Sequence, residues 1–394
     1  MRRHNLGVVL RHVSERGPRS RATIAQETGL NKTTVSRLVG ELIDLGLLLE
    51  RGIEARGTAG RPGHVVDIRR DGAVALGLEI NVDYLSVQAT DLAGGSRYRA
   101  REGGDNRGQD AGAVLDRLAA LASGALDEVR AQGVRAIGAT VALPGLVDVA
   151  GGTLLAAPNL GWSDVAIVDE LCARIAAPLS VDADNEANLA ALAELWEGVA
   201  VGVADFMYAS GQVGVGGGIV LAGELFRGYR GFGGELGHMV IDAAGEPCAC
   251  GSRGCLETRC GLEPLLASAG ATPLVTGSAR PVADLARRAR AQDPDALDAL
   301  HECGTWLGIA LGNVANLLSP QAVVLGGYFA PIATWLAPAI ERELASRVLG
   351  GAVPPVLTGS LGADAAVRGA AATQLRRVLA DPLSVGQLNS SGIS

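Results

Sequence analysis

The sequence is poor in aromatic residues and lacks a long uninterrupted hydrophobic run. Phe, Trp and Tyr together make up 3% of the 394 residues, whereas hydrophobic residues as a whole make up 48%. The core must therefore be built mainly from aliphatic side chains. In the most apolar region, Pro144, Asp148 and Pro158 interrupt the pattern before it reaches the roughly 20 residues that a membrane-spanning helix needs. We therefore expect a protein with no membrane partner.

The N-terminus also lacks the pattern of a secretion signal. After the first charged residues, the only apolar run extends from Leu6 to Leu10, and Arg11 interrupts it. This pattern predicts a cytoplasmic location. In that compartment the six cysteines of the chain are more compatible with a metal site than with a disulfide framework.

The segment GHMVIDAAGEPCACGSRGC, from Gly237 to Cys255, brings potential metal ligands together. A structural zinc ion takes four tetrahedral nitrogen and sulfur ligands. The intervening Gly and Ala residues allow the backbone to turn tightly, and two carboxylates, Glu235 and Glu257, flank the segment. We expect one rigid polar cluster around a structural Zn2+ ion. The predicted ligands are His238, Cys248, Cys250 and Cys255.

The alternative reading of the cysteines is that they are small buried hydrophobic residues. We expect this role for Cys172 and Cys303, which lie in helical apolar patterns, and Cys260 lies just beyond the predicted cluster. A chance Cys-x-Cys-x4-Cys pattern with a histidine ten residues upstream is much less compatible with this alternative. The metal site is therefore the favoured interpretation.

The charge of the chain is distributed unevenly. Residues 1–70 contain 13 Lys and Arg against 7 Asp and Glu, which gives +6, and subtraction from the total of −8 leaves −14 for the remainder. A basic head on an acidic body is typical of a head that contacts a polyanion. The alternative is an ordinary solvated surface, since these arginines need not share one face.

Three helices are predicted in the basic head. Apolar residues recur at helical spacing between Leu6 and Val13, in a helix that ends at Gly17-Pro18. Residues 20–30 form a short second helix closed by Gly29, and Asn31 is a suitable N-cap for the third helix. The apolar positions of the third helix form an inward stripe made of Val35, Leu38, Val39, Leu42 and Ile43.

Polar and basic residues remain on the outside of this third helix, and two extended runs follow it. Between residues 47 and 68 these runs flank a Gly-Arg-Pro-Gly tip, as in the wing of a winged helix, and an arginine at such a tip suits a minor groove. A three-helix protein-interaction module is the alternative. We expect the third helix to enter the major groove of double-stranded DNA and to contact its phosphates and base edges. The expected contacts are Lys32, Thr33, Thr34, Ser36, Arg37, Arg56 and Arg61.

From residue 73 the pattern changes to strands alternating with helices, which indicates an α/β body of two lobes with a cleft between them. The expected strands are residues 75–80, 85–90, 136–143, 179–181 and 321–325, with a further strand-rich stretch over 205–222. The expected helices are residues 111–132, 185–197 and 295–318, and a final helix beginning near 364.

Seven motifs occur in this body in a specific order, and together they resemble the ROK family of repressors and sugar kinases. They are GLVD at 145–148, PNLGW at 158–162, DNEAN at 184–188, GVGGGIV at 214–220, GELGH at 234–238, CACGSRGCLE at 248–257 and VVLGG at 323–327. The resemblance implies an α/β body of the actin-like, ribonuclease H-like ATPase type behind an N-terminal winged helix-turn-helix. We expect a DNA-binding domain over 1–70, a sugar-binding domain over 71–380 split near 185 with its C-terminal helix returning to the first lobe, and a tail over 381–394.

The family resemblance also implies a set of sugar-binding residues. In ROK kinases, sugar hydroxyls bind an Asn-Asp pair, the Glu and His of a Glu-x-Gly-His motif, and the Glu after the last zinc cysteine. The corresponding positions here, with the asparagine of PNLGW, are Asn159, Asn185, Glu186, Glu235, His238 and Glu257. The alternative for DNEAN is an acidic helix N-terminus favoured by the helix dipole.

Three departures from the kinase pattern argue against phosphoryl transfer. The stretch that corresponds to the kinase Asp-x-Gly-Gly-Thr loop is residues 79–83, where Asn81 and Val82 replace the glycines. The second phosphate loop, Gly-Thr-Gly in kinases, is 212–214 and reads Gln-Val-Gly. Glu186 replaces the aspartate that acts as general base, and a displacement of about an ångström can cost ~10²-fold in rate. No catalytic residue is therefore expected.

These observations predict a sugar-responsive transcriptional regulator, in particular a repressor of carbohydrate-utilisation genes that binds a sugar without phosphorylating it. Helix-turn-helix symmetry favours a homodimer, or a dimer of dimers, on a near-palindromic operator. One alternative is an ATP-dependent, glucokinase-like sugar kinase with a DNA-binding head. Another is a regulator that responds to a protein partner instead of a sugar.

Overall fold

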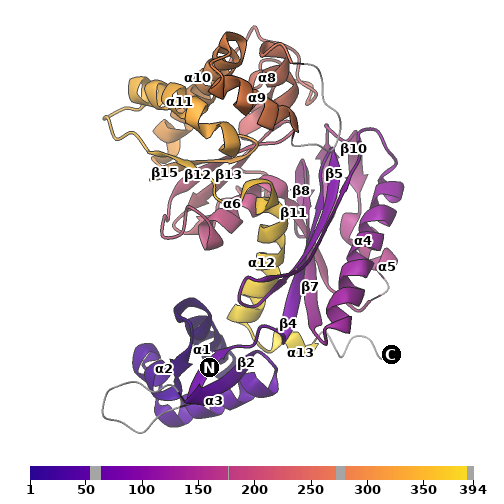
Figure 1. Cartoon of the computed structure of the whole chain (residues 1–394), viewed down its shortest axis with the longest axis vertical. Helices are drawn as coiled ribbons and strands as arrows, with labels where there is room; N and C mark the ends of the chain where they lie inside the picture. The colour runs from indigo at the N-terminus through magenta and orange to yellow at the C-terminus, as the bar shows by residue number, and fades with distance from the viewer. Residues whose placement is uncertain (54–63, 176, 272–279, 388–394) are drawn as a thin grey trace.

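The computed structural model describes residues 1–53, 64–175, 177–271 and 280–387. It contains a small head and a larger body of two lobes, and a single long helix, α12 (Ala365–Ala380), lies between the second lobe and the head (Figure 1). No helix in these ranges combines the length and hydrophobicity needed to cross a membrane.

The head is a helix-turn-helix with a small sheet. Its helices are α1 (Arg2–Arg16), α2 (Arg21–Thr28) and α3 (Lys32–Asp44), and its strands are β1 (Arg19–Ser20), β2 (Leu48–Ile53) and β3 (His64–Ile68), in the order β1-β3-β2. The side chain of Ser20 accepts a hydrogen bond from Thr23 N and caps α2. Asn31 caps α3 in the same way through Thr34 N, as the sequence predicts. Gly29, between the two helices, has φ 72°, a conformation that favours glycine.

The inward stripe of α3 agrees with the prediction except at its end. Val35, Leu38, Val39 and Leu42 are fully buried, whereas Ile43 is only partly buried. These residues pack with α1 and with Val66 of β3 in one aliphatic cluster. The helix-turn-helix expected for the head is therefore confirmed, together with a small sheet, whereas the Gly-Arg-Pro-Gly tip of the predicted wing lies outside the described residues.

The first lobe is built on a five-stranded sheet in the order β11-β7-β4-β5-β6. One face packs against helices α4 and α5 (Figure 1). A second, three-stranded sheet of order β10-β9-β8 lies beside it. The elements of this lobe are β4 (Ala73–Ile80), β5 (Tyr84–Asp91), β6 (Ser96–Gly103), α4 (Ala111–Ala131), β7 (Arg135–Leu143), β8 (Leu146–Asp148), β9 (Thr153–Ala157), β10 (Trp162–Val165), α5 (Ile167–Arg174) and β11 (Val181–Asn185).

The second lobe contains another five-stranded sheet, in the order β14-β13-β12-β15-β16. Helices α6 and α12 cover one face, and helices α8 to α11 cover the other. The elements are α6 (Glu186–Glu197), β12 (Phe206–Gly211), β13 (Val215–Leu221), β14 (Glu224–Leu225), η1 (Leu236–His238), α7 (Glu257–Cys260), α8 (Leu262–Ser268), α9 (Arg280–Arg290), α10 (Pro294–Leu318), β15 (Ala322–Gly327), η2 (Ala330–Ile332), α11 (Ala333–Arg347), β16 (Val356–Thr358) and η3 (Gly362–Asp364); α13 (Ser384–Gln387) follows α12.

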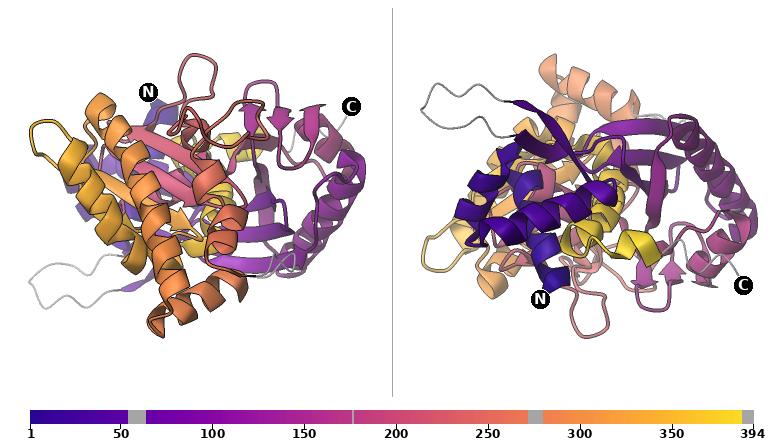
Figure 2. Two further views of the ribbon diagram at one scale, coloured as in Figure 1. Left: turned by 90° about the horizontal axis from the view of Figure 1, so that it is seen from above. Right: turned by 90° about the horizontal axis from the view of Figure 1, so that it is seen from below.

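Helix α12 connects the two lobes and the head through close backbone contacts. A Cβ atom at Gly369 would lie 1.9 Å from Leu189 O of α6, and one at Gly77 of β4 would lie 1.9 Å from Val367 O of α12. At its other end, α12 meets the head at Gly7 of α1. Figure 2 shows α12 and α13 beside the head helices when the molecule is viewed from below.

The structure differs from the sequence-based prediction mainly in the strands. The strand predicted at 179–181 is instead β11, at Val181–Asn185, parallel to β7. The sequence did not indicate this strand because Asp182 and Asp184 alternate with the buried Val181 and Ala183. In the structure, Asp182 pairs with Arg377 and Asp184 pairs with Arg227. The sequence analysis also missed β6, the small β8–β10 sheet, β16, and helices α5, α8, α9 and α11.

The contact at Gly7 leads to a test of head–body docking. A Cβ atom at Gly7 would lie 2.3 Å from Ala380 O, so Gly7→Ala should force α1 away from α12 and lower stability by roughly 1–3 kcal/mol. Gly40→Ala is the matched control, since a Cβ in α3 at Gly40 meets nothing within 4 Å and should be neutral or slightly stabilising. Thermal unfolding of both variants checks this, and an unchanged melting temperature for Gly7→Ala would contradict the close contact.

Candidate ligand cavity and metal-binding cluster

A polar cavity of about 60 Å³ lies between segments of the two lobes. Its wall combines the Pro144-Gly145 turn and the 157–159 loop of the first lobe with the start of α6 and loops of the second lobe. All six residues that the family resemblance implies for sugar binding line this one cavity. They are Asn159, Asn185, Glu186, Glu235, His238 and Glu257.

Asn185 is engaged in local structure at the start of α6. Its Oδ1 atom accepts hydrogen bonds from the backbone N–H groups of Ala187 and Asn188, and its Nδ2 atom donates to Gly145 O at 2.9 Å. Asn185 is therefore the N-cap of α6. The same bonds fix the rim of the cavity, because they tie α6 to the Pro144-Gly145 turn.

Glu186 is the most deeply buried carboxylate of the cavity, with 7% of its surface exposed. Burial, followed by the negative charges of Glu79 and Asp83, raises the pKa of Glu186 to about 8. Asn81 Nδ2 donates to Glu186 Oε2 at 3.2 Å. Burial also raises the pKa of Glu79, which accepts a hydrogen bond from Tyr84 OH at 2.6 Å, to about 7.

Asn159 and Glu257 meet at Gly214, on the loop between β12 and β13. A Cβ atom there would lie 2.5 Å from Glu257 Oε2 and 3.1 Å from Asn159 Nδ2. Only glycine leaves room for both side chains at this position. The segment 212–214 thus shapes the cavity, and Gln212 itself forms part of the wall.

Glu235 and His238 come from the short segment that contains helix η1. A Cβ atom at Gly237 would lie 2.0 Å from Val215 O, so the missing side chain lets this segment lie directly on β13. Burial raises the pKa of Glu235, the neighbouring His238 lowers it, and the charge of Glu257 raises it. Three carboxylates therefore share one partly desolvated space.

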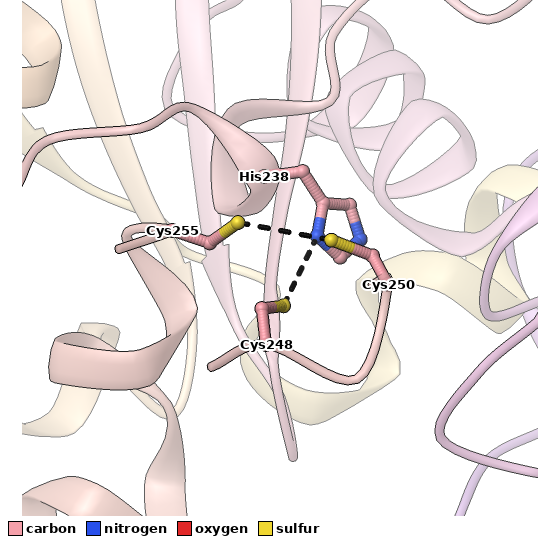
Figure 3. Close-up of side chains that lie close together, drawn as sticks. All are labelled: His238, Cys248, Cys250 and Cys255. Atoms are coloured by element: carbon pink, nitrogen blue, oxygen red, sulfur yellow. Dashed lines mark hydrogen bonds between the residues drawn. The ribbon is translucent and has the colours of Figure 1, made fainter. Parts of the chain in front are cut away.

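Next to the cavity, the four predicted metal ligands converge (Figure 3). One potential ligand atom from each of these residues lies within 4.8 Å of all the others, in a set formed by His238, Cys248, Cys250 and Cys255. The Sγ atoms of Cys250 and Cys255 are 3.7 Å apart, and Cys248 Sγ lies 3.8 Å from His238 Nδ1. A tetrahedral ion with metal–sulfur bonds of about 2.3 Å requires ligand separations of about 3.8 Å. The donor set therefore fits such an ion.

Backbone contacts shape the cysteine-bearing loop independently of any ion. Gly254 has φ 71°, and a Cβ there would lie 1.6 Å from Asp242 O. Gly254 N donates to Glu246 O and Cys248 N donates to Ser252 O, at 2.8 and 2.9 Å. These tight turns explain why glycine and small residues separate the four potential ligands.

Glu257 links the cluster to the cavity. Its Oε1 atom lies 2.9 Å from Cys248 Sγ, which donates to it, and 3.5 Å from His238 Nδ1. Because Nδ1 faces the cluster, Nε2 of His238 is the ring nitrogen left for the cavity. A metal bound by the cluster would thereby fix the orientation of the histidine ring.

The charge of the cavity has one sign. Its lining residues include three glutamates and no Lys or Arg. Arg227 lies near the cavity, but it donates to both carboxylate oxygens of Asp184, at 3.0 and 2.6 Å. The cavity is therefore suited to a ligand that donates hydrogen bonds, and unsuited to an anion.

Five of the seven residues expected to contact DNA lie together at the start of α3. Lys32, Thr33, Ser36 and Arg37 are exposed, and Thr34 is partly buried. Arg56 and Arg61 lie outside the described residues. Arg21 of α2 was missed by the sequence analysis, although it donates to Ser36 O at 3.2 Å and pairs with Glu50 at 2.9 Å beside α3.

Two further residues of the site were missed by the sequence analysis. Asn81 was interpreted only as an obstruction to phosphate, yet it bonds to Glu186 and, at 3.4 Å, to Gln212 Oε1. Arg227 holds Asp184 of the DNEAN motif. Neither contact leaves a local sequence signal, because each joins residues that are far apart in the chain.

The remaining cysteines differ in their surroundings. Cys303 and Cys260 are buried, and Cys260 Sγ donates to Cys303 O at 3.4 Å. Cys172 is exposed, so the prediction that it is a buried hydrophobic residue is wrong. It lies on the outer side of α5, where the buried positions are Ile167 and Leu171.

The raised pKa of Glu186 leads to a pH-dependent prediction. Its folded pKa of about 8 lies above the ordinary value of 4.5, so its contribution to stability is present at low pH and is lost as pH rises toward 8. From pH 6 to 8, the wild type should lose roughly 2 kcal/mol more unfolding free energy than Glu186→Gln, which cannot ionise. Chemical denaturation at both pH values tests this. Parallel losses in the two proteins would show that Glu186 titrates normally.

Comparisons with known proteins place this architecture. The model of the ROK family matches residues 75–377, and the model of the MarR family matches residues 8–57 of the head. The chain is 31% identical over 368 residues to a xylose repressor from Bacillus spizizenii, and the matched region covers 93% of each protein.

Two solved structures extend the similarity to three dimensions. A ROK family transcriptional regulator, described as a homologue of the E. coli MLC protein, covers 98% of both chains with 27% identity and a TM-score of 0.80. A ROK family glucokinase from Streptomyces griseus, solved with glucose and AMPPNP, covers 76% of this chain and 98% of its own at 27% identity, with a TM-score of 0.67. The kinase resembles the chain over a smaller part of its length than the regulator does. With its winged-helix head and two-lobed body, the chain belongs to the ROK family.

Proposed function

We propose that the chain is a sugar-responsive transcriptional repressor of carbohydrate-utilisation genes, which binds operator DNA through α3 and a neutral sugar in the interlobe cavity. The observation that carries this proposal is the combination, in one chain, of an exposed basic helix end and a cavity walled by three carboxylates. Similarity to a xylose repressor over 93% of the chain supports a role in carbohydrate regulation.

The chemistry of the cavity favours an unphosphorylated ligand. Carboxylates accept hydrogen bonds from sugar hydroxyls, and asparagine can both donate and accept. A sugar phosphate would need cationic side chains or free helix N–H groups, and no Lys or Arg lines the cavity. The N–H groups of Ala187 and Asn188, at the start of α6, are already bonded to the Asn185 side chain.

The two segments that the family resemblance aligns with the kinase phosphate loops support a proposal of binding without phosphoryl transfer. Asn81 occupies the first loop, and its amide bonds to Glu186, Tyr84 and Gln212. Two buried glutamates, Glu79 and Glu186, lie beside this segment. A kinase needs backbone N–H groups that face ATP at this place, and a carboxyl group does not supply them. We infer that the cavity holds the sugar and does not transfer a phosphate to it.

We infer further that the cluster of His238 and three cysteines holds a structural zinc ion. A zinc ion held by these four residues would cross-link the loop between Pro247 and Leu256 to the GELGH segment. The protein residues then perform the recognition, because the cross-link fixes His238 and leaves Glu257 positioned at the cavity wall. As a zinc ligand Cys248 would be a thiolate and would no longer donate to Glu257, which would leave this carboxylate free to accept a hydrogen bond from the ligand.

A packed route leads from the cavity to the head. Helix α6 begins at the cavity with Glu186, and α12 crosses α6 where Gly369 lies against Leu189 O. The far end of α12 rests on Gly7 of the head. A sugar that favours one angle between the lobes would shift α12 and thus the spacing of two heads in a homodimer, which changes operator affinity.

The zinc inference predicts the effect of removing one ligand. Cys250→Ala should lose bound zinc and lower the melting temperature of the body, because the cross-link contributes folding free energy. Cys172→Ala, at an exposed cysteine far from the cluster, should keep both. Zinc content by mass spectrometry and thermal unfolding measure the two effects. Full zinc content with unaltered melting in Cys250→Ala would refute the site.

Two substitutions should separate sugar binding from DNA binding. Glu235→Gln should abolish the sugar-induced rise in melting temperature and leave operator affinity without sugar unchanged. Arg37→Ala should do the reverse, with operator affinity reduced by about 1–3 kcal/mol. A carbohydrate screen by thermal shift and an operator titration at fixed salt provide the readouts. If either variant lost both responses while remaining folded, the assignment would fail.

A third prediction distinguishes repressor from kinase. The sugar identified in the screen should raise the melting temperature, whereas its phosphate ester should have no effect, because no Lys or Arg lines the cavity to pair with the phosphate. In a coupled assay with ATP and that sugar, no product should form above background. Sustained phosphorylation of the sugar would establish the kinase alternative.

A further inference from the structure

A second cavity, of about 410 Å³, lies in the first lobe, away from the interlobe cavity. It lies at the start of β7, where Arg135 pairs with Ala73, the first residue of the strand that follows the head. The end of α4, the segment before β11 and helix α13 complete its wall. The lining residues are Leu126, Val129, Arg130, Gly133, Val134, Arg135, Ala136, Ile137, Ala177, Pro178, Leu179 and Val385.

Arg135 in this wall is a cation without a counter-charge. Among the described residues it makes no side-chain hydrogen bond or ion pair, and its Nε atom is buried with no acceptor. Burial lowers the pKa of the guanidinium, and no carboxylate offsets this effect. A buried donor without an acceptor is unfavourable, so the guanidinium of Arg135 is suited to an anionic partner.

Arg130 provides the contrast within the same wall. It forms an ion pair at 2.8 Å with Asp127, one turn earlier on α4, and both side chains are exposed. Its charge is therefore already balanced at the surface. Arg135 is the lining cation that remains available to a ligand.

The rest of the wall is apolar. Nine of the twelve lining residues carry only aliphatic or proline side chains, and none is acidic. An inorganic anion would satisfy Arg135 and leave these surfaces without contacts, whereas a neutral hydrocarbon would leave the guanidinium unpaired. Only a ligand with an anionic end and an apolar body matches both features, and the volume lies within the usual range of small-molecule sites.

We propose that this cavity binds an organic carboxylate with a hydrocarbon body, the carboxylate paired with Arg135 and the body packed among the aliphatic side chains. An arginine binds a carboxylate through two parallel N–H···O bonds, which fixes the ligand's orientation. Ile137 and Val385 belong both to this wall and to the hydrophobic cluster that contains the head core. Occupation of the cavity therefore stabilises the junction of head and body.

Calorimetric titration of the full chain with octanoate tests the proposal. Octanol, which lacks the anionic group, and inorganic phosphate, which lacks the hydrocarbon body, are the comparison probes. Octanoate should bind one equivalent, and the two other probes at least tenfold more weakly. Arg135→Gln should weaken octanoate binding at least tenfold, and Arg130→Gln should leave it unchanged. The melting temperature of Arg135→Gln should not fall, because the substitution removes a half-buried charge that has no partner among the described residues.

A second variant guards against an effect of misfolding. Ala177 is only partly buried, so Ala177→Phe should fill the cavity from its edge and block octanoate while leaving Arg135 intact. Failure of octanoate to bind the wild type overturns the proposal. Equal octanoate affinity in wild type and Arg135→Gln, or in wild type and Ala177→Phe, also overturns it. Because neither Arg135 nor Ala177 lines the interlobe cavity, these outcomes are independent of the sugar response.

Discussion

The convergence of one histidine and three cysteines is the constraint on which the rest of the ligand cavity depends. Their ligand atoms lie within 4.8 Å of one another, in a loop whose turn at Gly254 would place a Cβ atom 1.6 Å from Asp242 O. The cluster shares His238 with the wall of the cavity, and its Cys248 contacts Glu257, another residue of that wall. A distortion of the loop would therefore move two of the groups that face a ligand.

Burial of carboxylates is the second organising feature. Glu186 and Glu79 lie in a desolvated space, and their raised pKa values reflect the cost of holding two negative charges there. Asn81 offsets part of this cost by donating to Glu186. The same asparagine also donates to Gln212, so one residue joins the buried acid to the opposite wall of the cavity.

The sequence was sufficient to predict features that depend on local chemistry. Asn31 as an N-cap, Gly29 as a helix end and the spacing of the four potential metal ligands each follow from a short segment. The sequence was insufficient where long-range pairing decides the structure. The strand at Val181–Asn185 appears polar because Arg227 and Arg377, distant in the chain, neutralise its aspartates. The double role of Asn185 was equally hidden, since Gly145 O, its partner, lies 40 residues away.

Calorimetry of sugar binding, with and without metal, tests the account most directly. A neutral sugar that raises the melting temperature should be titrated into the zinc-loaded chain and into the same chain after removal of zinc by a chelator. If the metal cluster orients the cavity, affinity should fall at least a hundredfold in the metal-free chain, and the loss should be reversed when zinc is restored. Equal affinity in the two forms, with the body still folded, would contradict the account.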